Sequence, residues 1–75
     1  MAKLFMIQTA LHNLTQEGTA EVVGTGWSFS LDEGNRLFVD CGDEGFTYQF
    51  YYLETDSFSE IEALESVSEL KELLA

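Results

Sequence analysis

Large and small side chains alternate along the middle of the chain. Between Thr19 and Leu31 the odd positions are mostly large, and the even positions are mostly small or polar. A period of two residues is what a strand with one buried face produces, so this stretch predicts a strand. Gly24 and Gly26 lie inside it and indicate a bulge or bend, because glycine weakens a flat strand.

Two turn clusters follow this strand. The first is Asp32-Glu33-Gly34-Asn35 and the second is Gly42-Asp43-Glu44-Gly45, and both are rich in residues that tolerate the backbone of tight hairpins. Residues 37–41 and 46–53 alternate in the same way as the first strand. Three strands separated by short turns predict an antiparallel meander.

The C-terminal part predicts a helix. Ser57 and Glu60 form a Ser-x-x-Glu capping box, and a helix-rich run follows. At about 100° per residue, leucine, valine and alanine gather on one side of that helix and glutamates on the other. Phe58 and Ile61 fall on the acidic side. A second box at Ser66 offers a reason, because the segment is then two short helices broken there; the alternative is one helix whose first turn packs differently.

Residues 3–14 fit two patterns. Helical spacing is shown by Leu4, Ile7, Leu11 and Leu14, and strand spacing by Phe5, Ile7, Thr9 and Leu11. We expect a strand, because a clear helix N-cap is lacking and Phe, Ile and Thr favour sheet. Residues 13–18 are then its return loop. The chain as a whole predicts one α+β domain over residues 1–75, in which an antiparallel meander of three to four strands is packed by a C-terminal helix or helix pair.

Charge narrows the choice of partner. The chain carries 14 acids against 3 lysines and arginines, for a net charge of −11. Such a surface repels nucleic acid and anionic membranes, so we expect neither as a direct partner. A basic protein or a cation is the natural complement. The alternative is that the acidity only keeps a small protein soluble.

Residues with catalytic potential are few. His12 is the only histidine, and no motif pairs it with a nucleophile. Cys41 stands among acids, which favour its thiol form, and we expect it to be a small buried strand residue. The acids around the turns do not have the spacing of a calcium loop. We therefore expect a protein that is not an enzyme and has neither cofactor nor metal, with weak divalent-cation binding as a secondary hypothesis.

Location is indicated by three features. The lone cysteine fits a reducing compartment, and the longest purely apolar run, Leu4 to Ile7, is far too short to span a bilayer. The N-terminus lacks the long apolar region of a secretory signal. We expect a cytoplasmic protein.

Three sets of residues are candidates for binding a partner. The first is an acidic stripe on the predicted helix, where neighbouring like charges would carry a small stability cost: Glu62, Glu65, Glu69 and Glu72. The second is the acids of the turns: Asp32, Glu33, Asp40, Asp43 and Glu44. The third is the sheet face turned away from the predicted core: Phe38, Tyr51 and Leu53.

In size and charge the chain is similar to small acidic inhibitors encoded by phages and mobile elements, among them anti-restriction and anti-CRISPR proteins that mimic DNA. The similarity is one of composition and not of a motif. It implies a protein that occludes a basic, nucleic-acid-handling surface of a partner. The alternative is a structural module or homodimer joined through the aromatic sheet face.

Overall fold

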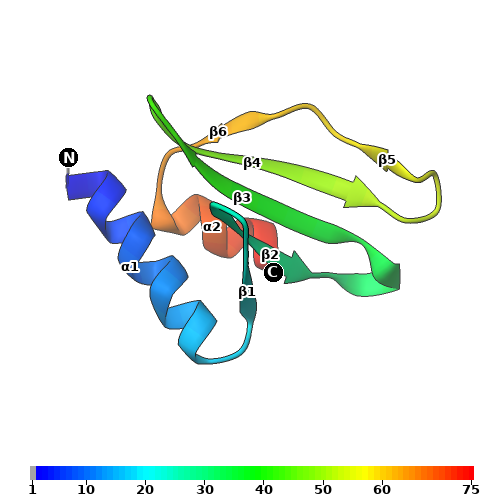
Figure 1. Cartoon of the computed structure of the whole chain (residues 1–75), viewed down its shortest axis with the longest axis horizontal. Coiled ribbons are helices and arrows are strands. Elements are labelled where there is room, and N and C mark those ends of the chain that lie inside the picture. The colour runs from blue at the N-terminus through cyan, green and yellow to red at the C-terminus, as the bar shows by residue number, and fades with distance from the viewer. Residues whose placement is uncertain (1) are drawn as a thin grey trace.

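The computed structural model describes residues 2–75, with side chains from Leu4 onward. It contains two helices and six short antiparallel strands in one sheet (Figure 1). The α+β class and the meander predicted from the sequence are confirmed. The N-terminal helix and the additional strands are differences from that prediction.

The chain begins with helix α1, Ala2–Gln16. Ile7 and Leu11 lie one helical turn apart, and both are fully buried. The expectation of a strand over residues 3–14 is wrong, because packing of these two side chains on the sheet outweighs the β-propensity of Phe5 and Thr9. In a helix, the spacing of Leu4, Ile7, Leu11 and Leu14 places all four side chains on one side. In a strand, successive side chains would point to opposite faces, and Leu4 and Leu14 would lie opposite Ile7 and Leu11.

Strands β1 (Ala20–Val23) and β2 (Gly26–Ser30) form a hairpin. The predicted strand over residues 19–31 is therefore divided, and the glycines mark a tight turn instead of a bend. Gly24 has a φ of 59°, which glycine adopts without the clash that a Cβ would cause. Gly at the first of two loop residues is typical of a type II′ hairpin turn.

A 3₁₀ turn at Asp32–Gly34 leads into β3 (Arg36–Gly42), which pairs with β4 (Gly45–Tyr52) over its whole length. This part of the meander is confirmed. Strand β3 is the centre of the sheet, because β2 pairs with its other side.

The segment predicted as the start of a helix is extended. β5 (Ser57–Phe58) and β6 (Glu62–Leu64) each pair with part of β4, so the box at Ser57 caps no helix. The only helix among the described residues after the sheet, α2, spans Val67–Leu74. Ser66 is its N-cap: its hydroxyl accepts a hydrogen bond from the Glu69 N–H at 3.1 Å, and a Glu69 carboxylate oxygen accepts one from the Glu65 N–H at 2.8 Å. The predicted boundary at Ser66 is thus confirmed as a helix start.

One core joins both helices to one face of the sheet. Ile7 and Leu11 of α1 and Leu70 of α2 belong to the same buried cluster as strand residues from the centre of the sheet, Phe29, Leu37, Val39 and Phe46. We call the sheet face that carries these residues the inner face and the opposite one the outer face. Because side chains alternate along a strand, Phe38 lies on the outer face between its neighbours Ser28 and Gln49.

The close approach of β2 to β3 gives a test of the sheet. A Cβ placed on Gly26 would lie 2.3 Å from the Val39 carbonyl oxygen, whereas one on Gly42 would lie 3.5 Å from the Gly45 oxygen. We expect Gly26→Ala to lower the free energy of unfolding by about 1–3 kcal/mol, because backbone must move. Gly42→Ala is the matched control and should be close to neutral. Chemical denaturation measures both, and equal stability of the two variants would contradict the β2–β3 register.

The cap at Ser66 gives a second test. Ser66→Ala removes the acceptor for the Glu69 N–H, and we expect the free energy of unfolding to fall by about 1 kcal/mol. Ser68→Ala is the control, because Ser68 is exposed inside α2 and alanine is the better helix former there. Denaturant melts would refute the assignment of the N-cap if Ser68→Ala were as destabilising as Ser66→Ala.

Candidate protein-binding surface

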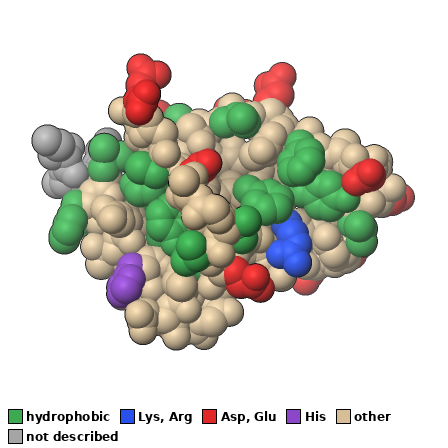
Figure 2. Space-filling view, viewed as in Figure 1, with side chains coloured by type: hydrophobic (Ala, Val, Ile, Leu, Met, Phe, Trp, Pro, Cys, Tyr) green, Lys and Arg blue, Asp and Glu red, His purple; other side chains and the backbone are tan. Residues whose placement is uncertain are grey.

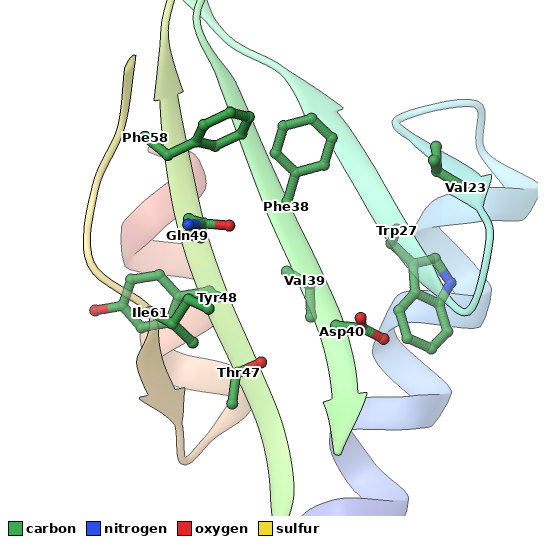
Figure 3. A pocket seen from close by; sticks show the side chains of 10 residues that line it. All are labelled: Val23, Trp27, Phe38, Val39, Asp40, Thr47, Tyr48, Gln49, Phe58 and Ile61. Atoms are coloured by element: carbon green, nitrogen blue, oxygen red, sulfur yellow. The ribbon is translucent and has the colours of Figure 1, made fainter.

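The outer face of the sheet is covered by neither helix. Strand pairing places Ser28, Phe38 and Gln49 in one row across this face, and Arg36 and Tyr51 in the next. Figure 3 shows the face from the front, with both helices behind the sheet. A sheet covered on one side only leaves the other side available for a partner.

Aromatic side chains gather on the outer face. The ring of Phe58 lies 5.0 Å from that of Tyr51 and 6.1 Å from that of Phe38, in tilted arrangements that aromatic pairs favour. Phe58 nevertheless remains 58% exposed, and Ile61 is 66% exposed. Figure 2 shows hydrophobic side chains reaching the surface over the strands. Exposed aromatic and aliphatic groups of this kind are typical of protein interfaces.

A shallow groove of about 340 Å³ crosses this face. Phe58 and Ile61 line one side of it, Phe38 lies in the middle, and Val23 lies at the other side beside the β1–β2 turn (Figure 3). Asp40 brings a carboxylate to the groove, where its Oδ1 accepts hydrogen bonds from the Thr25 hydroxyl at 3.0 Å and from the Cys41 N–H at 2.8 Å. The groove is therefore apolar along most of its length and acidic at one point.

Acids lie at both ends of the central strands. Asp43 and Glu44 form the β3–β4 turn, and Asp32 and Glu33 lie before β3 at the opposite end. A seven-residue strand such as β3 is roughly 23 Å long, so the two acidic turns cannot form a single site. Asp40, by contrast, is a strand residue of the outer face. The arrangement is an apolar face with separate negative charge at each end.

One base also belongs to this face. Arg36 is exposed at the start of β3, and its guanidinium donates a hydrogen bond to the buried Ser28 hydroxyl at 3.0 Å. That bond holds the side chain across the sheet and satisfies the hydroxyl. The outer face is therefore not uniformly negative, and its negative charge is concentrated toward the turns.

The predicted acidic helix stripe does not exist as such. Glu62 lies in β6, Glu65 in the following loop, and only Glu69 and Glu72 in α2. The carboxylate of Glu69 accepts a hydrogen bond from the Glu65 N–H, just before the N-cap of α2. The physical reason is that β6 pairs with β4, which takes the first half of the segment out of the helix.

Tyr48 lies on the inner-face side of β4, because it pairs with Val39, and Glu62 of β6 pairs with it from the other side. Burial raises the pKa of Tyr48 above its ordinary value of 10.0, and the negative charges of Glu69 and Glu62 raise it further.

The third residue predicted for the sheet face lies outside it. Leu53 follows the end of β4, is 54% exposed, and belongs to the turn that meets the 3₁₀ segment: its N–H donates to the Asn35 side-chain oxygen at 3.0 Å. Phe38 and Tyr51 are on the outer face as predicted. Phe58 and Ile61 were missed as members, although their misfit on the acidic side of the predicted helix was a signal that the segment is not helical there.

The residues considered for chemistry are dispersed. His12 is exposed on α1, with a ring nitrogen 3.4 Å from the Gln16 amide nitrogen, and Cys41 is exposed at the end of β3, contrary to the expectation that it is buried. In residues 2–75 no group of three or more His, Cys, Asp or Glu side chains is placed to hold a metal ion.

A second hollow, of about 420 Å³, lies between the two helices. Its apolar lining comes from residues such as Leu14, Leu70 and Leu74, which also pack against the core. Glu17 and Lys71 both belong to its lining, so it lacks the acidic bias of the rest of the molecule. The outer face is the surface that combines an aromatic cluster with acidic turns at both of its ends.

Comparisons with known proteins give no relative: no protein-family model matches the chain, and no curated protein or solved structure matches it significantly. Within the described residues, neither helix combines the length and the apolar character needed to cross a bilayer.

The turn after β4 gives a test of the outer-face geometry. The Tyr51 hydroxyl donates a hydrogen bond of 2.5 Å to the Asp56 carboxylate, and this bond, followed by desolvation and the charge of Asp56, raises the pKa of Tyr51 above 10.0. The protonated phenol is thus favoured in the folded state. Its contribution to stability is complete below pH 10.0, the ordinary pKa, and is lost as the pH rises through the raised pKa.

We expect Asp56→Asn to lower the pKa of Tyr51 toward 10.0, because the negative acceptor is gone. Asparagine tolerates the positive φ of 49° at this position, so the turn is retained. Alkaline titration of tyrosinate absorbance measures the change, and Tyr51→Phe identifies the Tyr51 component. An unchanged Tyr51 titration in Asp56→Asn would contradict the bond.

Proposed function

We propose that this protein is a small acidic binding protein that docks its outer sheet face on a basic surface of another protein. The observation that carries the proposal is the Phe38–Tyr51–Phe58 cluster on the uncovered face, where Phe58 is exposed and Phe38 and Tyr51 are half-buried, in a chain with a net charge of −11. Aromatic groups supply contact area at low entropic cost, and the surrounding carboxylates attract a basic partner.

A nucleic-acid-handling enzyme or complex is the partner class we favour. Its basic groove is built to attract phosphates, and the acids at the two ends of β3 offer separated negative charge across a span of roughly 23 Å. Occupation of such a groove would exclude nucleic acid and so inhibit the partner. This is the mode of action of the small acidic anti-restriction and anti-CRISPR inhibitors to which the chain is similar in size and charge, and it would operate in the cytoplasm.

Self-association through the same face is the second candidate, supported by the exposure of Phe58 and Ile61. Two copies, however, would each bring a charge of −11, and this repulsion opposes a close dimer at low salt. Charge therefore favours a basic partner over a second copy. A dimer would become tighter as salt rises, whereas a complex with a basic partner would become weaker.

The proposal is tested with a variant pair of the same chemistry. Phe58→Ser removes the centre of the outer cluster, and Phe5→Ser is the control because Phe5 is 70% exposed on α1, outside that cluster. The immobilised proteins are exposed to nuclease-treated cell extract and eluted with a salt gradient. We expect wild type and Phe5→Ser to retain basic nucleic-acid-binding proteins. Phe58→Ser should bind the same proteins at least about tenfold more weakly.

Purified partners then allow a quantitative check. Duplex DNA should compete with the wild-type protein for each partner, and affinity should fall as salt rises. Circular dichroism establishes that both variants fold. Equal retention by Phe58→Ser and Phe5→Ser, or capture that DNA does not compete with, would refute docking by this face on a nucleic-acid groove.

A further inference from the structure

The two edges of the sheet differ in whether further strands pair with them. At the β4 side, β5 and β6 pair with β4, and between them Ser59 closes the gap: the Ser59 N–H donates to the Phe50 carbonyl, and the Phe50 N–H donates to the Ser59 hydroxyl, both at 2.9 Å. At the opposite side, β1 is the terminal strand (Figure 1). Among residues 2–75, one edge of the central strands is therefore covered, and the other edge, at β1, is open.

The pairing register determines which backbone groups β1 presents. Val23 and Gly26 flank a two-residue turn and pair with each other, so they exchange both of their backbone hydrogen bonds. Glu21 pairs with Ser28 in the same way. The N–H and C=O of Val22, which lies between them, consequently point away from β2, toward the open edge.

The side chains of this edge are exposed on both faces of the strand. Val22 is 64% exposed and Val23 is 50% exposed, with Glu21 exposed before them. Glu21 and Val23 point to the outer face, and Val22 points to the inner one, because successive side chains alternate. Val23 also lines the outer-face groove with Phe38 and Phe58, so the open edge and the candidate docking face are continuous.

We propose that β1 is a second part of the docking surface, to which an extended segment of a basic partner protein adds as a further strand. The segment's backbone would pair with Val22, and its side chains would lie beside those of β1. The residue beside Glu21 would be basic, and those beside Val22 and Val23 would be apolar. This inference rests on the proposed function for the charge of the partner, but it assigns a different contact.

Charge distinguishes this occupant from a second copy. Edge strands that pair with their own kind lead to dimers or aggregates, and natural proteins resist this with charged residues on the edge. Glu21 and the net charge of −11 repel another copy of this chain and so oppose edge-to-edge pairing. The same charges attract a basic segment, so the edge is open to one class of partner and closed to the other.

The test uses a defined peptide as the probe. The capped peptide Thr-Lys-Val-Val-Lys-Thr carries two adjacent apolar residues with a basic residue on either side, which matches Val22, Val23 and Glu21 in either strand direction. A copy with N-methylated backbone amides carries the same side chains but cannot pair with a strand. We expect the unmodified peptide to bind at least tenfold more tightly than the N-methylated copy, by fluorescence anisotropy. Amide exchange at Val22 should slow when the unmodified peptide binds. Equal binding of the two peptides, or no binding of either, would overturn the proposal.

Two protein variants test the edge. Val22→Pro removes an N–H that points away from β2, so it leaves the β1–β2 ladder intact and should weaken peptide binding at least tenfold. Leu53→Ser changes an exposed apolar residue that follows β4, outside the outer face and away from β1, and should leave peptide binding within about twofold. The reverse pattern would overturn the edge assignment, and the partner-capture experiment with Phe58→Ser would still decide the proposed function independently. A wild-type dimer in light scattering that Val22→Pro abolishes would identify a second copy as the occupant and also overturn the proposal.

Discussion

Packing of α1 and α2 on the same side of β3 is the constraint on which the rest of this molecule depends. Ile7 and Leu11 share one buried cluster with Leu37, Val39 and Leu70, and among residues 2–75 neither helix covers the outer face. The aromatic groups of that face must then pack on one another, as Phe58 does between Tyr51 and Phe38. One-sided packing thus both builds the core and creates the surface that distinguishes the protein.

The sequence predicted the centre of this arrangement better than its ends. Alternation over residues 37–52, bounded by Asp32–Asn35 and Gly42–Gly45, led to the correct meander because both faces of β3 and β4 keep the period of two. It also placed Phe38 and Tyr51 together on the outer face. Residues 3–14 were mistaken for a strand, because the single positions that decide the matter, Ile7 and Leu11, satisfy both patterns and only tertiary packing separates them.

The error over residues 57–65 had a different cause. A Ser-x-x-Glu box and high helix propensity are local signals, and the pairing of β5 and β6 with β4 is not local. Ser59 illustrates the competition: its hydroxyl accepts a hydrogen bond from Phe50 in the neighbouring strand, a partner that no local pattern reveals. The acidic stripe was lost with the helix. Phe58 and Ile61, the residues that had fitted that helix badly, proved to be the exposed apolar groups of the outer face.

This chain has both a large net charge and exposed apolar side chains. The positions of the charges relative to the apolar side chains explain how the two can occur together. The aromatic cluster, through its exposed Phe58, and the open edge at Val22 would each favour self-association if the chain were neutral. A charge of −11 on so small a domain opposes every contact between copies, whichever surfaces meet, because repulsion at distances near the Debye length of ~8 Å does not depend on register. Glu21 and Asp40 add local repulsion where the apolar groups lie closest to the edge and the groove. Apolar surface can therefore remain exposed as long as the opposing surface is also acidic, and it becomes available when the opposing surface is basic.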